Sequence, residues 1–320
     1  MSVSASTRRR RSPVRIVSFL LLVVLRLAAA PAALQAQDLT IGLMPAVDSI
    51  PLLIAEDQGY FDAEGVSVEL RMFRNQLYRE SALQTNEIDG SISDLINAVY
   101  NWQAESGIRV ASITDGHFAL VTSPGSGIRT VRDWNRAGEL RVGLLENSII
   151  YYVAERMLEE IEADADAIRI VRTLQVPVRL EMVASNQIQA GLLPEPVADL
   201  AEQRGAHTLV DSSVLDQTPG VLLFTARALE EKREEIRALY RAYNRAVEAI
   251  NADPDSFRPA IVRLGEFPPP VEDRMFIPRY QPARPPTPAE LADVTTWMLE
   301  KGLAEASPDY REVVAPDVVP

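Results

Sequence analysis

The stretch from Asp38 to Leu70 constrains the fold of this chain more than any other, because it reads as a strand, a loop, a helix and a second strand. Leu39–Met44 is a short apolar run rich in strand formers, and a segment broken by proline and polar residues follows it. Pro51 then lies in the first turn of an apolar helix, where its missing N–H costs nothing, and Gly59 ends that helix. In this βαβ start, the loop after the first strand leads directly to a helix N-terminus. The free N–H groups of a helix N-terminus can bind a ligand.

Apolar runs of strand length alternate with helical patterns along most of the remaining chain, which predicts an α/β fold with parallel sheets. The Gly/Ser/Pro loop Ser123–Gly127 and the apolar run Gly220–Thr225 are the places where we expect the chain to cross between lobes. No internal repeat is evident. The predicted organisation is two Rossmann-like lobes joined by two chain crossings, with a ligand cleft between the lobes. The expected segments are 37–122 for the first part of lobe 1, 123–220 for lobe 2 and 221–320 for the return to lobe 1.

The first 36 residues have the pattern of a signal peptide. The basic run Arg8–Arg11 precedes the apolar segment Ile16–Leu25, and an Ala-rich stretch offers a cleavage site after Ala36. The apolar segment has the length of a signal-peptide core and is short for a membrane span, although a retained membrane anchor is the alternative. We therefore expect export to the periplasm and removal of residues 1–36.

Charge and composition exclude several classes of protein. Residues 37–320 carry 26 basic and 45 acidic residues, a formal net charge of −19. A surface of this charge repels nucleic acid and anionic lipid, so nucleic acid is not expected as a partner. The chain has no cysteine and two histidines, which excludes disulfides and zinc–thiolate sites and leaves few ligands for other metals.

The C-terminal part contains both the clearest helix and the least regular segment. Apolar side chains recur at helical spacing from Ile236 to Ile250. Pro268–Pro288 is rich in proline and irregular. Thr287–Glu290 then has the pattern of a capping box with proline at the first helical position, which predicts a last helix that ends at Gly302.

Four pieces of the chain carry a resemblance to a known family. They are the stretch from Pro45 through Gly59-Tyr60-Phe61, the run Ile88-Asp89-Gly90-Ser91 with Asp94, Val142-Gly143 with the polar loop Glu146–Ser148, and Gly191-Leu192-Leu193-Pro194-Glu195-Pro196. In this order and spacing, over Asp38–Ser256, the chain resembles the substrate-binding proteins of bacterial ABC importers that serve thiamine pyrimidine precursors, sulfonates and nitrate. The resemblance implies a type II periplasmic binding protein, hinge closure around a small-molecule ligand, and an ABC permease of the inner membrane as partner.

In such folds ligands bind at the carboxyl ends of parallel strands, where loops of the two lobes face each other. Asp48 is the strongest candidate, because its loop has no evident structural need for a carboxylate. Several other candidates stand at predicted helix starts, where a capping role explains them equally well. Glu195, between two prolines, can either close the lobes or bind the ligand. The candidate ligand-binding residues are Met44, Asp48, Ser49, Ser91, Ser93 and Asp94 from lobe 1, and Glu146, Asn147, Ser148, Tyr151, Tyr152 and Glu195 from lobe 2.

Tyr151 and Tyr152 are neighbours on one predicted helix, so their side chains point about 100° apart. At most one of them should face the cleft, and the other is expected in the core. Arg74 and Arg79 are expected on the solvated surface rather than as ligand clamps. Thr218 is a further candidate from lobe 2.

The residue types indicate a class of ligand. Carboxylates at Asp48, Asp94 and Glu195 suit a ligand with N–H donors or positive charge, and a tyrosine ring suits a flat ring or a cation. The prediction is a nitrogenous heterocycle such as a thiamine pyrimidine precursor. A sulfonate, taurine or nitrate is the alternative, since the helix N-termini at Ser49 and Ser148 can supply N–H donors to an anion.

An enzyme is the alternative from another class, because the resembled superfamily includes a thiamine-pyrimidine synthase that uses pyridoxal phosphate. Such chemistry needs a Schiff-base lysine in a pocket. Lys232 lies in a charged helix face and Lys301 at a helix end, and neither setting is typical of a catalytic lysine. The chain also has no phosphate loop, no G-x-S-x-G and no metal-binding histidine pair. The sequence thus predicts a monomeric receptor without catalytic activity, metal or cofactor, whose membrane partner is a permease or, on the same binding physics, a sensor.

Overall fold

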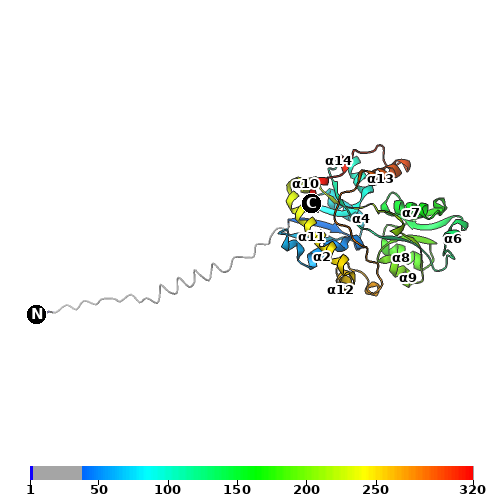
Figure 1. Cartoon of the computed structure of the whole chain (residues 1–320), viewed down its shortest axis with the longest axis horizontal. Coiled ribbons are helices and arrows are strands. Elements are labelled where there is room, and N and C mark those ends of the chain that lie inside the picture. The colour runs from blue at the N-terminus through cyan, green and yellow to red at the C-terminus, as the bar shows by residue number, and fades with distance from the viewer. Residues whose placement is uncertain (3–37, 320) are drawn as a thin grey trace. The chain divides into compact units, whose positions relative to one another are not determined.

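The computed structural model describes residues 1–2 and 38–319, so the predicted signal peptide and its cleavage site at Ala36 lie outside the described residues. From residue 38 onward the chain forms one compact unit that contains two five-stranded sheets (Figure 1). Within these ranges, no helix is both long enough and apolar enough to cross a membrane.

Sheet A is the centre of lobe 1 and has the strand order β2-β1-β3-β10-β4. Its strands are β1 Leu39–Leu43, β2 Val68–Met72, β3 Gly90–Asp94, β4 Arg109–Ile113 and β10 Gly220–Phe224. The helices of this lobe are α2 Ile50–Asp57, α3 Tyr60–Ala63, α4 Gln76–Gln84, α5 Leu95–Gln103, α10 Ala226–Glu231, α11 Arg233–Ala252 and α12 Pro254–Leu264.

Sheet B is the centre of lobe 2 and has the strand order β7-β6-β8-β5-β9. Its strands are β5 Phe118–Thr122, β6 Leu140–Leu144, β7 Ile168–Arg172, β8 Ala190–Pro194 and β9 His207–Asp211. The helices of this lobe are α6 Val131–Arg136, α7 Ile149–Glu160, α8 Val176–Ala184 and α9 Val197–Gln203.

Each sheet is mixed rather than wholly parallel, which corrects the expectation from the sequence. β10 runs antiparallel to β3 and β4, and β5 runs antiparallel to β8 and β9. The reason lies in the crossings. β4 ends at the edge of sheet A where the parallel strands end, and only residues 114–117 separate it from β5. The chain therefore enters sheet B at the same kind of edge and has to run against the parallel strands.

The first crossing lies earlier than Ser123–Gly127, where we expected it, because β5 already pairs with β8 and β9. The second crossing covers residues 212–219 and leads into β10. The cleft edges of the two sheets are thus joined by two short segments that lie side by side. Thr218 in the second segment donates its hydroxyl to the carbonyl of Gly116 in the first, at 2.9 Å.

Lobe 1 is held together largely by α11, the helix whose apolar spacing is clearest in the sequence. Its residues from Ile236 to Ile250 that recur at helical spacing are buried, and the helix packs on α2 and α3 (Figure 1). Phe224 of β10 meets Tyr240 of α11 edge to face at 6.4 Å between ring centroids. This cluster covers one face of sheet A.

The two lobes repeat one structural unit at a spacing of 100 residues, although no repeat was evident in the sequence. Arg79 in α4 and Arg179 in α8 are both buried. Asn86 and Asn186, which follow these helices, have positive φ angles of 57° and 58°. Asparagine tolerates this left-handed conformation better than most residues. The repeat is hard to see in the sequence, because the residues that are identical in the two lobes are mainly those that the backbone conformation or burial requires.

The C-terminal part begins with the proline-rich segment and continues into α13 Pro288–Glu300 and α14 Tyr310–Val313. The capping box at Thr287–Glu290 is confirmed, since each side chain of the pair accepts a hydrogen bond from the backbone N–H of the other. α13 packs on α5 of lobe 1.

Candidate functional site

The loop after β1 brings Asp48 against the first crossing. Oδ1 of Asp48 is buried and has no hydrogen-bond partner among the described residues. Its Oδ2 lies 3.8 Å from the place where a Cβ on Gly116 would stand. Burial raises the pKa of Asp48 to about 6, with Arg79 acting in the opposite direction and Asp115 in the same direction. Asp48 is therefore a buried acceptor at the junction of the two lobes.

Ser49 and Met44 have mainly local roles in the same loop. The buried Ser49 hydroxyl donates to the carbonyl of Met44 at 2.7 Å, and the Ser49 side chain does not cap α2. Met44 is half-buried. These contacts fix the backbone path that carries Asp48 into its position.

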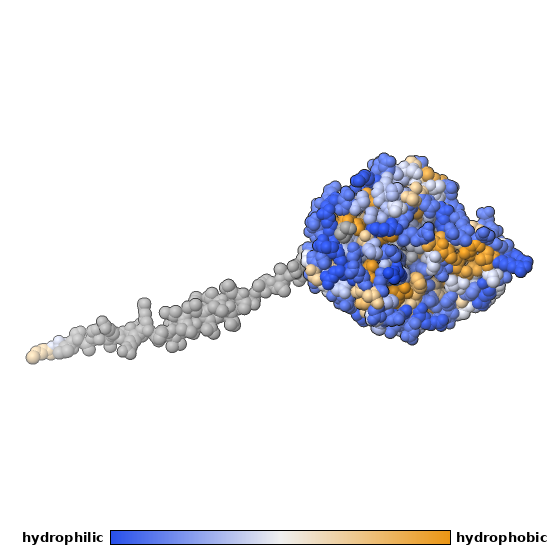
Figure 2. Space-filling model, in the orientation of Figure 1, coloured by the Kyte–Doolittle hydropathy of each residue, from blue (hydrophilic) through white to orange (hydrophobic). Residues whose placement is uncertain are grey.

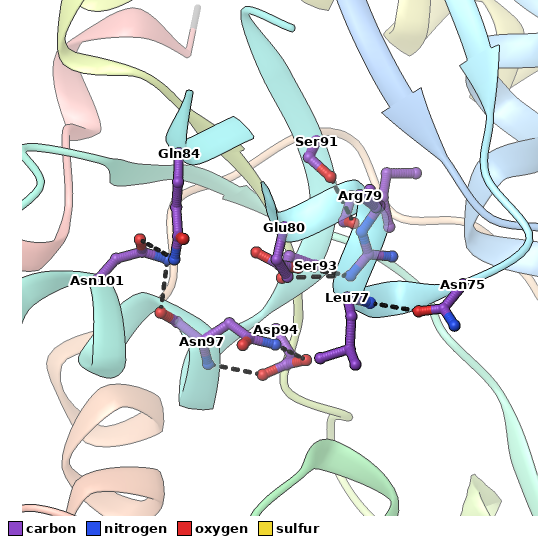
Figure 3. Close-up of polar contacts among 11 residues, drawn as sticks. Asn75, Leu77, Arg79, Glu80, Gln84, Ser91, Ser93, Asp94, Asn97 and Asn101 are labelled. Carbon is purple, nitrogen blue, oxygen red and sulfur yellow. Dashed lines mark hydrogen bonds and ion pairs between the residues drawn. The ribbon is translucent and has the colours of Figure 1, made fainter. Parts of the chain in front are cut away.

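Arg79 is buried, at 5% exposure, where the sequence analysis expected a solvated surface residue. Its Nη2 contacts Oε1 of Glu80 at 2.7 Å, and the Ser93 hydroxyl donates to the same Glu80 oxygen at 2.7 Å. Figure 3 shows these three side chains pointing toward one another. Arg74 is exposed and pairs with Glu266, as expected for a surface arginine. The position of Arg79 in the repeat, matched by a second arginine 100 residues later, is the signal that could have identified it.

Asp94 ends β3 and caps α5, which is the structural role that we considered for it. Its carboxylate accepts from the backbone N–H and from the side-chain amide of Asn97, both at 2.8 Å (Figure 3). Burial raises the pKa of Asp94 to about 6, and Arg79 lowers it in part. Ser91, also fully buried, donates to the carbonyl of Ile92. The charge of the Arg79 guanidinium thus lowers the pKa of both Asp48 and Asp94.

The lobe 2 candidates occupy positions equivalent to those of lobe 1. The loop after β6 carries Glu146 and Asn147, which are exposed, and the buried Ser148. The Ser148 hydroxyl donates to the carbonyl of Leu145 at 2.5 Å, as Ser49 does to Met44, and does not cap α7. Glu146 and Asn147 are free to reach a ligand, whereas Ser148 is engaged in its own loop.

Glu195 follows β8 as Asp94 follows β3, and it is 6% exposed. Its Oε2 accepts from the backbone N–H of Asp199 in the first turn of α9 at 3.2 Å, and its own N–H donates to the carbonyl of His117 at 3.0 Å. Burial, reinforced by the charge of Asp199, raises the pKa of Glu195 to about 8. Glu195 therefore joins lobe 2 to the first crossing.

Both tyrosines of α7 lie against α13, which the sequence analysis did not foresee. The ring centroids of Tyr151 and Tyr152 are 5.8 and 5.4 Å from that of Trp297, and both pairs are edge to face. Nζ of Lys301 lies 5.2 Å from the Tyr151 ring centroid, and the Tyr152 hydroxyl donates to Asp293. Tyr152 is buried in the apolar core, as expected for one of the two, whereas the half-buried Tyr151 packs beside Trp297 of the C-terminal helix.

The first crossing contributes two residues that the sequence analysis did not single out, Asp115 and His117. Burial raises the pKa of Asp115 to about 6, and its Oδ2 accepts from the backbone N–H of Gln281 at 2.8 Å. The His117 ring stacks on Phe276 with 4.1 Å between centroids, and burial lowers its pKa. Both depend on partners from the proline-rich segment, far away in the sequence, so local patterns could not reveal them.

Around the crossing, then, stand the carboxyl groups of Asp48, Asp115 and Glu195, each with a raised pKa. Buried carboxylates of this kind attract N–H donors and cations, because such a partner offsets the lost hydration. No group of three or more histidine, aspartate or glutamate side chains in residues 38–319 is arranged to hold a metal ion.

Residues 46–257 match the family model described as NMT1/THI5 like. The chain belongs to this family. The suspected relation to substrate-binding proteins of ABC importers is thereby confirmed at the level of the family, and the match includes both crossings and all twelve candidate residues except Met44. No curated protein sequence matches the chain.

Solved structures show the fold of this NMT1/THI5-like chain in other proteins. A ligand-binding component of an ABC-type import system from Staphylococcus aureus, solved with zinc bound, has a TM-score of 0.73 and 18% identity, covering 88% of this chain and 98% of that one. The alkanesulfonate-binding protein of Xanthomonas axonopodis pv. citri, bound to MOPS, has a TM-score of 0.70 and 19% identity, covering 90% and 99%. The desulfurization enzyme DSZB has a TM-score of 0.63 and 16% identity, covering 87% and 97%. The shared architecture is the two-lobed periplasmic binding protein fold.

The surface of this NMT1/THI5-like protein is mostly hydrophilic on the face that Figure 2 shows, with hydrophobic areas between hydrophilic ones. Some of the exposed apolar side chains stand at the starts of α4 and α8, again at equivalent places in the two lobes. They are Leu77 and Tyr78 in lobe 1 and Leu174 and Val178 in lobe 2. The carboxyl ends of both sheets thus carry apolar side chains at equivalent places.

Proposed function

We propose that this protein is an extracytoplasmic solute receptor of an ABC-type importer, and that its ligand carries N–H donors or positive charge. A nitrogenous heterocycle of the thiamine-pyrimidine-precursor type fits this description. The observation that carries the proposal is the buried Oδ1 of Asp48, which has no hydrogen-bond partner in the described chain. A buried acceptor without a donor is costly, and an N–H group of the ligand would remove that cost.

The other carboxyl groups around the crossing support the same ligand class. Asp48, Asp115 and Glu195 have raised pKa values because burial disfavours their ionised forms. A cation or an N–H donor between them favours ionisation and lowers these pKa values. Arg79 offsets the effect of burial on Asp48 only in part, and Glu80 pairs with the same guanidinium. The negative charge of these carboxylates is therefore available to a ligand that carries N–H donors or positive charge.

The mechanism that we propose is closure of the two lobes around the ligand. Asp48 and Asp94 act from lobe 1, and Asn147 and Glu195 act from lobe 2. A ligand that touches both sets binds the closed arrangement better than the open one and shifts the population toward it.

An anionic ligand such as a sulfonate, taurine or nitrate is the second candidate. Two observations favour it besides the alkanesulfonate-binding protein of the same fold. Arg179 in lobe 2 is 2% exposed and contacts no carboxylate in the described chain. The first turn of α7 has no side-chain cap, so its N–H groups remain free to bind an anion.

An enzymatic function finds less support in the residues, although a desulfurization enzyme shares the fold. Nζ of Lys232 pairs with the buried carboxylate of Asp89 at 2.9 Å, and Nζ of Lys301 pairs with Glu155 at 2.7 Å. Both lysines are thus engaged in ion pairs that hold elements together. We infer that neither serves as a Schiff-base lysine, and that the protein binds its ligand without converting it.

The remaining parts of the proposal concern place and partners. We propose that the N-terminal segment directs export to the periplasm, that the mature protein is a monomer, and that it delivers its ligand to a permease of the inner membrane. The proposal rests on the signal-peptide pattern and on the family.

The experiment is a binding panel read by thermal unfolding and calorimetry on the purified protein. It contains hydroxymethyl- and formylamino-pyrimidines, thiamine, taurine, alkanesulfonates and nitrate. A ligand present at 100 times its dissociation constant stabilises the folded state by about 2.7 kcal/mol. We expect a pyrimidine to do so at pH 8 and to bind more weakly below pH 6, where Asp48 becomes protonated.

Asp48→Asn tests the residue, and Asp62→Asn is its control, because Asp62 is an exposed aspartate of the same lobe and the charge change is the same. We expect Asp48→Asn to lose at least about tenfold in affinity, the typical scale of one charge-assisted hydrogen bond. The control should bind as the parent does. Stabilisation by sulfonates or nitrate alone would refute the heterocycle and keep the receptor, whereas conversion of a panel compound would refute the receptor.

A further inference from the structure

The C-terminal residues 268–301, which we call the strap, contact both lobes. On one side of the molecule, α13 binds α7 of lobe 2. Nη2 of Arg156 lies 2.8 Å from Oδ1 of Asp293, and the Tyr152 hydroxyl donates to the same carboxylate. One turn further along, Glu155 accepts from Nε1 of Trp297 at 2.7 Å and pairs with Lys301. Two carboxylates, one from each helix, thus join the strap to lobe 2.

An apolar core continues through this contact. Trp297 and Met298 of α13 are buried in one cluster with Val99 of α5 in lobe 1 and with Tyr152 and Met157 of α7 in lobe 2. A cavity of only about 50 Å³ remains between α13, Tyr152 and the second crossing. The strap therefore packs against both lobes through buried apolar side chains.

A second set of contacts joins the strap to α9 of lobe 2. The backbone N–H of Phe276 donates to Oδ2 of Asp199 at 3.1 Å, and the Gln203 side chain donates to the carbonyl of Pro270 at 3.1 Å. Phe276 also stacks on His117 in the first crossing. These contacts lie on different helices of lobe 2 from those of α13, so lobe 2 is held at two places.

Between these two places the strap follows the first crossing. The N–H of Gln281 donates to Asp115 at 2.8 Å, and the carbonyl of Arg284 accepts from the N–H of Ile113 at 2.9 Å. Tyr280, 1% exposed, donates its hydroxyl to the carbonyl of Val47 next to Asp48 at 2.8 Å. The strap therefore lies along the segment that has to bend when the lobes rotate, and its residues hold the wall of the candidate site.

We propose that the strap is a third connection between the lobes, which limits the opening of the cleft and holds the ligand-free protein near the closed arrangement. Rotation of lobe 2 away from lobe 1 stretches both sets of contacts. Opening then requires that the ion pairs of α13 with α7 separate and that Phe276 leaves His117. The strap would set the rate of ligand exchange, whatever the ligand is.

The distance between the lobes tests the proposal without any ligand. Because the chain contains no cysteine, Asp62→Cys in lobe 1 and Asp166→Cys in lobe 2, both at exposed positions, give two unique sites for fluorescent labels. Energy transfer between the labels reports the distribution of interlobe distances. The release variant combines Asp293→Ala, Lys301→Ala and Phe276→Ala. Its control is Asp57→Ala, which breaks the 2.7 Å pair of Asp57 with Arg263 inside lobe 1.

We expect the release variant to populate longer interlobe distances, with the open-to-closed ratio rising about two- to five-fold for each ion pair lost. The control should show the distances of the parent. A folded release variant with the parent's distance distribution would overturn the proposal. If the release variant does not fold, the Asp293→Ala/Lys301→Ala double variant tests the proposal through the same distribution of interlobe distances. Since no ligand is present, a failed binding panel leaves this result unaffected.

Discussion

In lobe 1, Arg79 forms an ion pair with Glu80 at 2.7 Å, whereas the equivalent Arg179 in lobe 2 donates to the carbonyls of Leu192 and Thr173, each at 2.7 Å. Leu180 stands where lobe 1 has Glu80. Both arginines extend from the first turns of a helix, and Arg179 reaches the backbone of its sheet directly. Both lobes thus keep a buried arginine between a helix and the sheet. The partners of its positive charge differ, since Arg79 pairs with a carboxylate and Arg179 donates to backbone carbonyls.

The carboxylates at the ends of equivalent strands differ in the same way. Asp94 after β3 and Glu195 after β8 both accept from an N–H in the first turn of the next helix. Burial raises both pKa values. Asp94 has both Glu80 and Arg79 nearby, and its pKa is about 6, whereas the charged groups that act on Glu195 are all acidic, and its pKa is about 8. The two lobes thus present similar geometry and different charge to the cleft.

The largest effect is expected from replacing the two arginines by methionine. Arg79→Met leaves Glu80 buried without its cation, which typically costs about 3–5 kcal/mol in the free energy of unfolding. Arg179→Met leaves two carbonyls without donors, which costs about 2 kcal/mol. Chemical denaturation measures both.

The double variant Arg79→Met/Glu80→Leu gives lobe 1 a leucine at position 80, as lobe 2 has at Leu180, and removes the ion pair. Because it removes the unpaired carboxylate along with the arginine, we expect it to recover most of the stability lost in Arg79→Met. A double variant as unstable as the single one would contradict the electrostatic account of the difference between the lobes.

The pH dependence of stability should separate the two cap carboxylates. Glu195 has a folded-state pKa of about 8 and an ordinary value of 4.5, so the folded state binds more protons between these values and stability falls as pH rises. Glu195→Gln should remove a fall of roughly 1–2 kcal/mol between pH 6 and pH 8. Asp94→Asn should change the profile between pH 4 and pH 6 instead, since its pKa is about 6. Unfolding curves across this pH range measure both, and coinciding profiles for the two variants would count against the comparison.

The smallest effect concerns two glycines at equivalent places in β1 and β6. A Cβ on Gly42 would stand 2.7 Å from Cδ1 of Ile88 and 3.3 Å from Cγ of Arg79, and one on Gly143 would stand 2.7 Å from Cδ1 of Ile188 and 3.0 Å from Cγ of Arg179. We expect Gly42→Ala and Gly143→Ala to cost about 1–2 kcal/mol each, as overpacking does. Gly143→Ala should cost more, because Arg179 approaches more closely and both ends of its guanidinium are fixed by carbonyls. Thermal unfolding of both variants measures the difference, and equal costs would show that the arginine is not the limiting neighbour.

Much of the fold could be predicted from the sequence, because its signals are local. The βαβ start at Asp38–Leu70, the apolar face of α11 and the capping box at Thr287–Glu290 depend on neighbours within a few residues, and each formed as expected. The first crossing was placed too late, because Phe118–Thr122 reads as a strand in either lobe and only its pairing with β8 assigns it to sheet B.

In the candidate site, too, some features follow from the local sequence and others from tertiary contacts. The loops that carry Asp48 and Asn147 follow from strand ends and helix starts, so the sequence by itself determined where these candidate residues stand. Only the tertiary structure decided that Arg79 is buried beside Glu80, that α13 covers Tyr151 and Tyr152, and that Phe276 stacks on His117. The aromatic contacts join residues 145 to 159 positions apart, and the setting of Arg79 depends on burial. A charged or aromatic side chain looks the same in a sequence whether water or protein surrounds it.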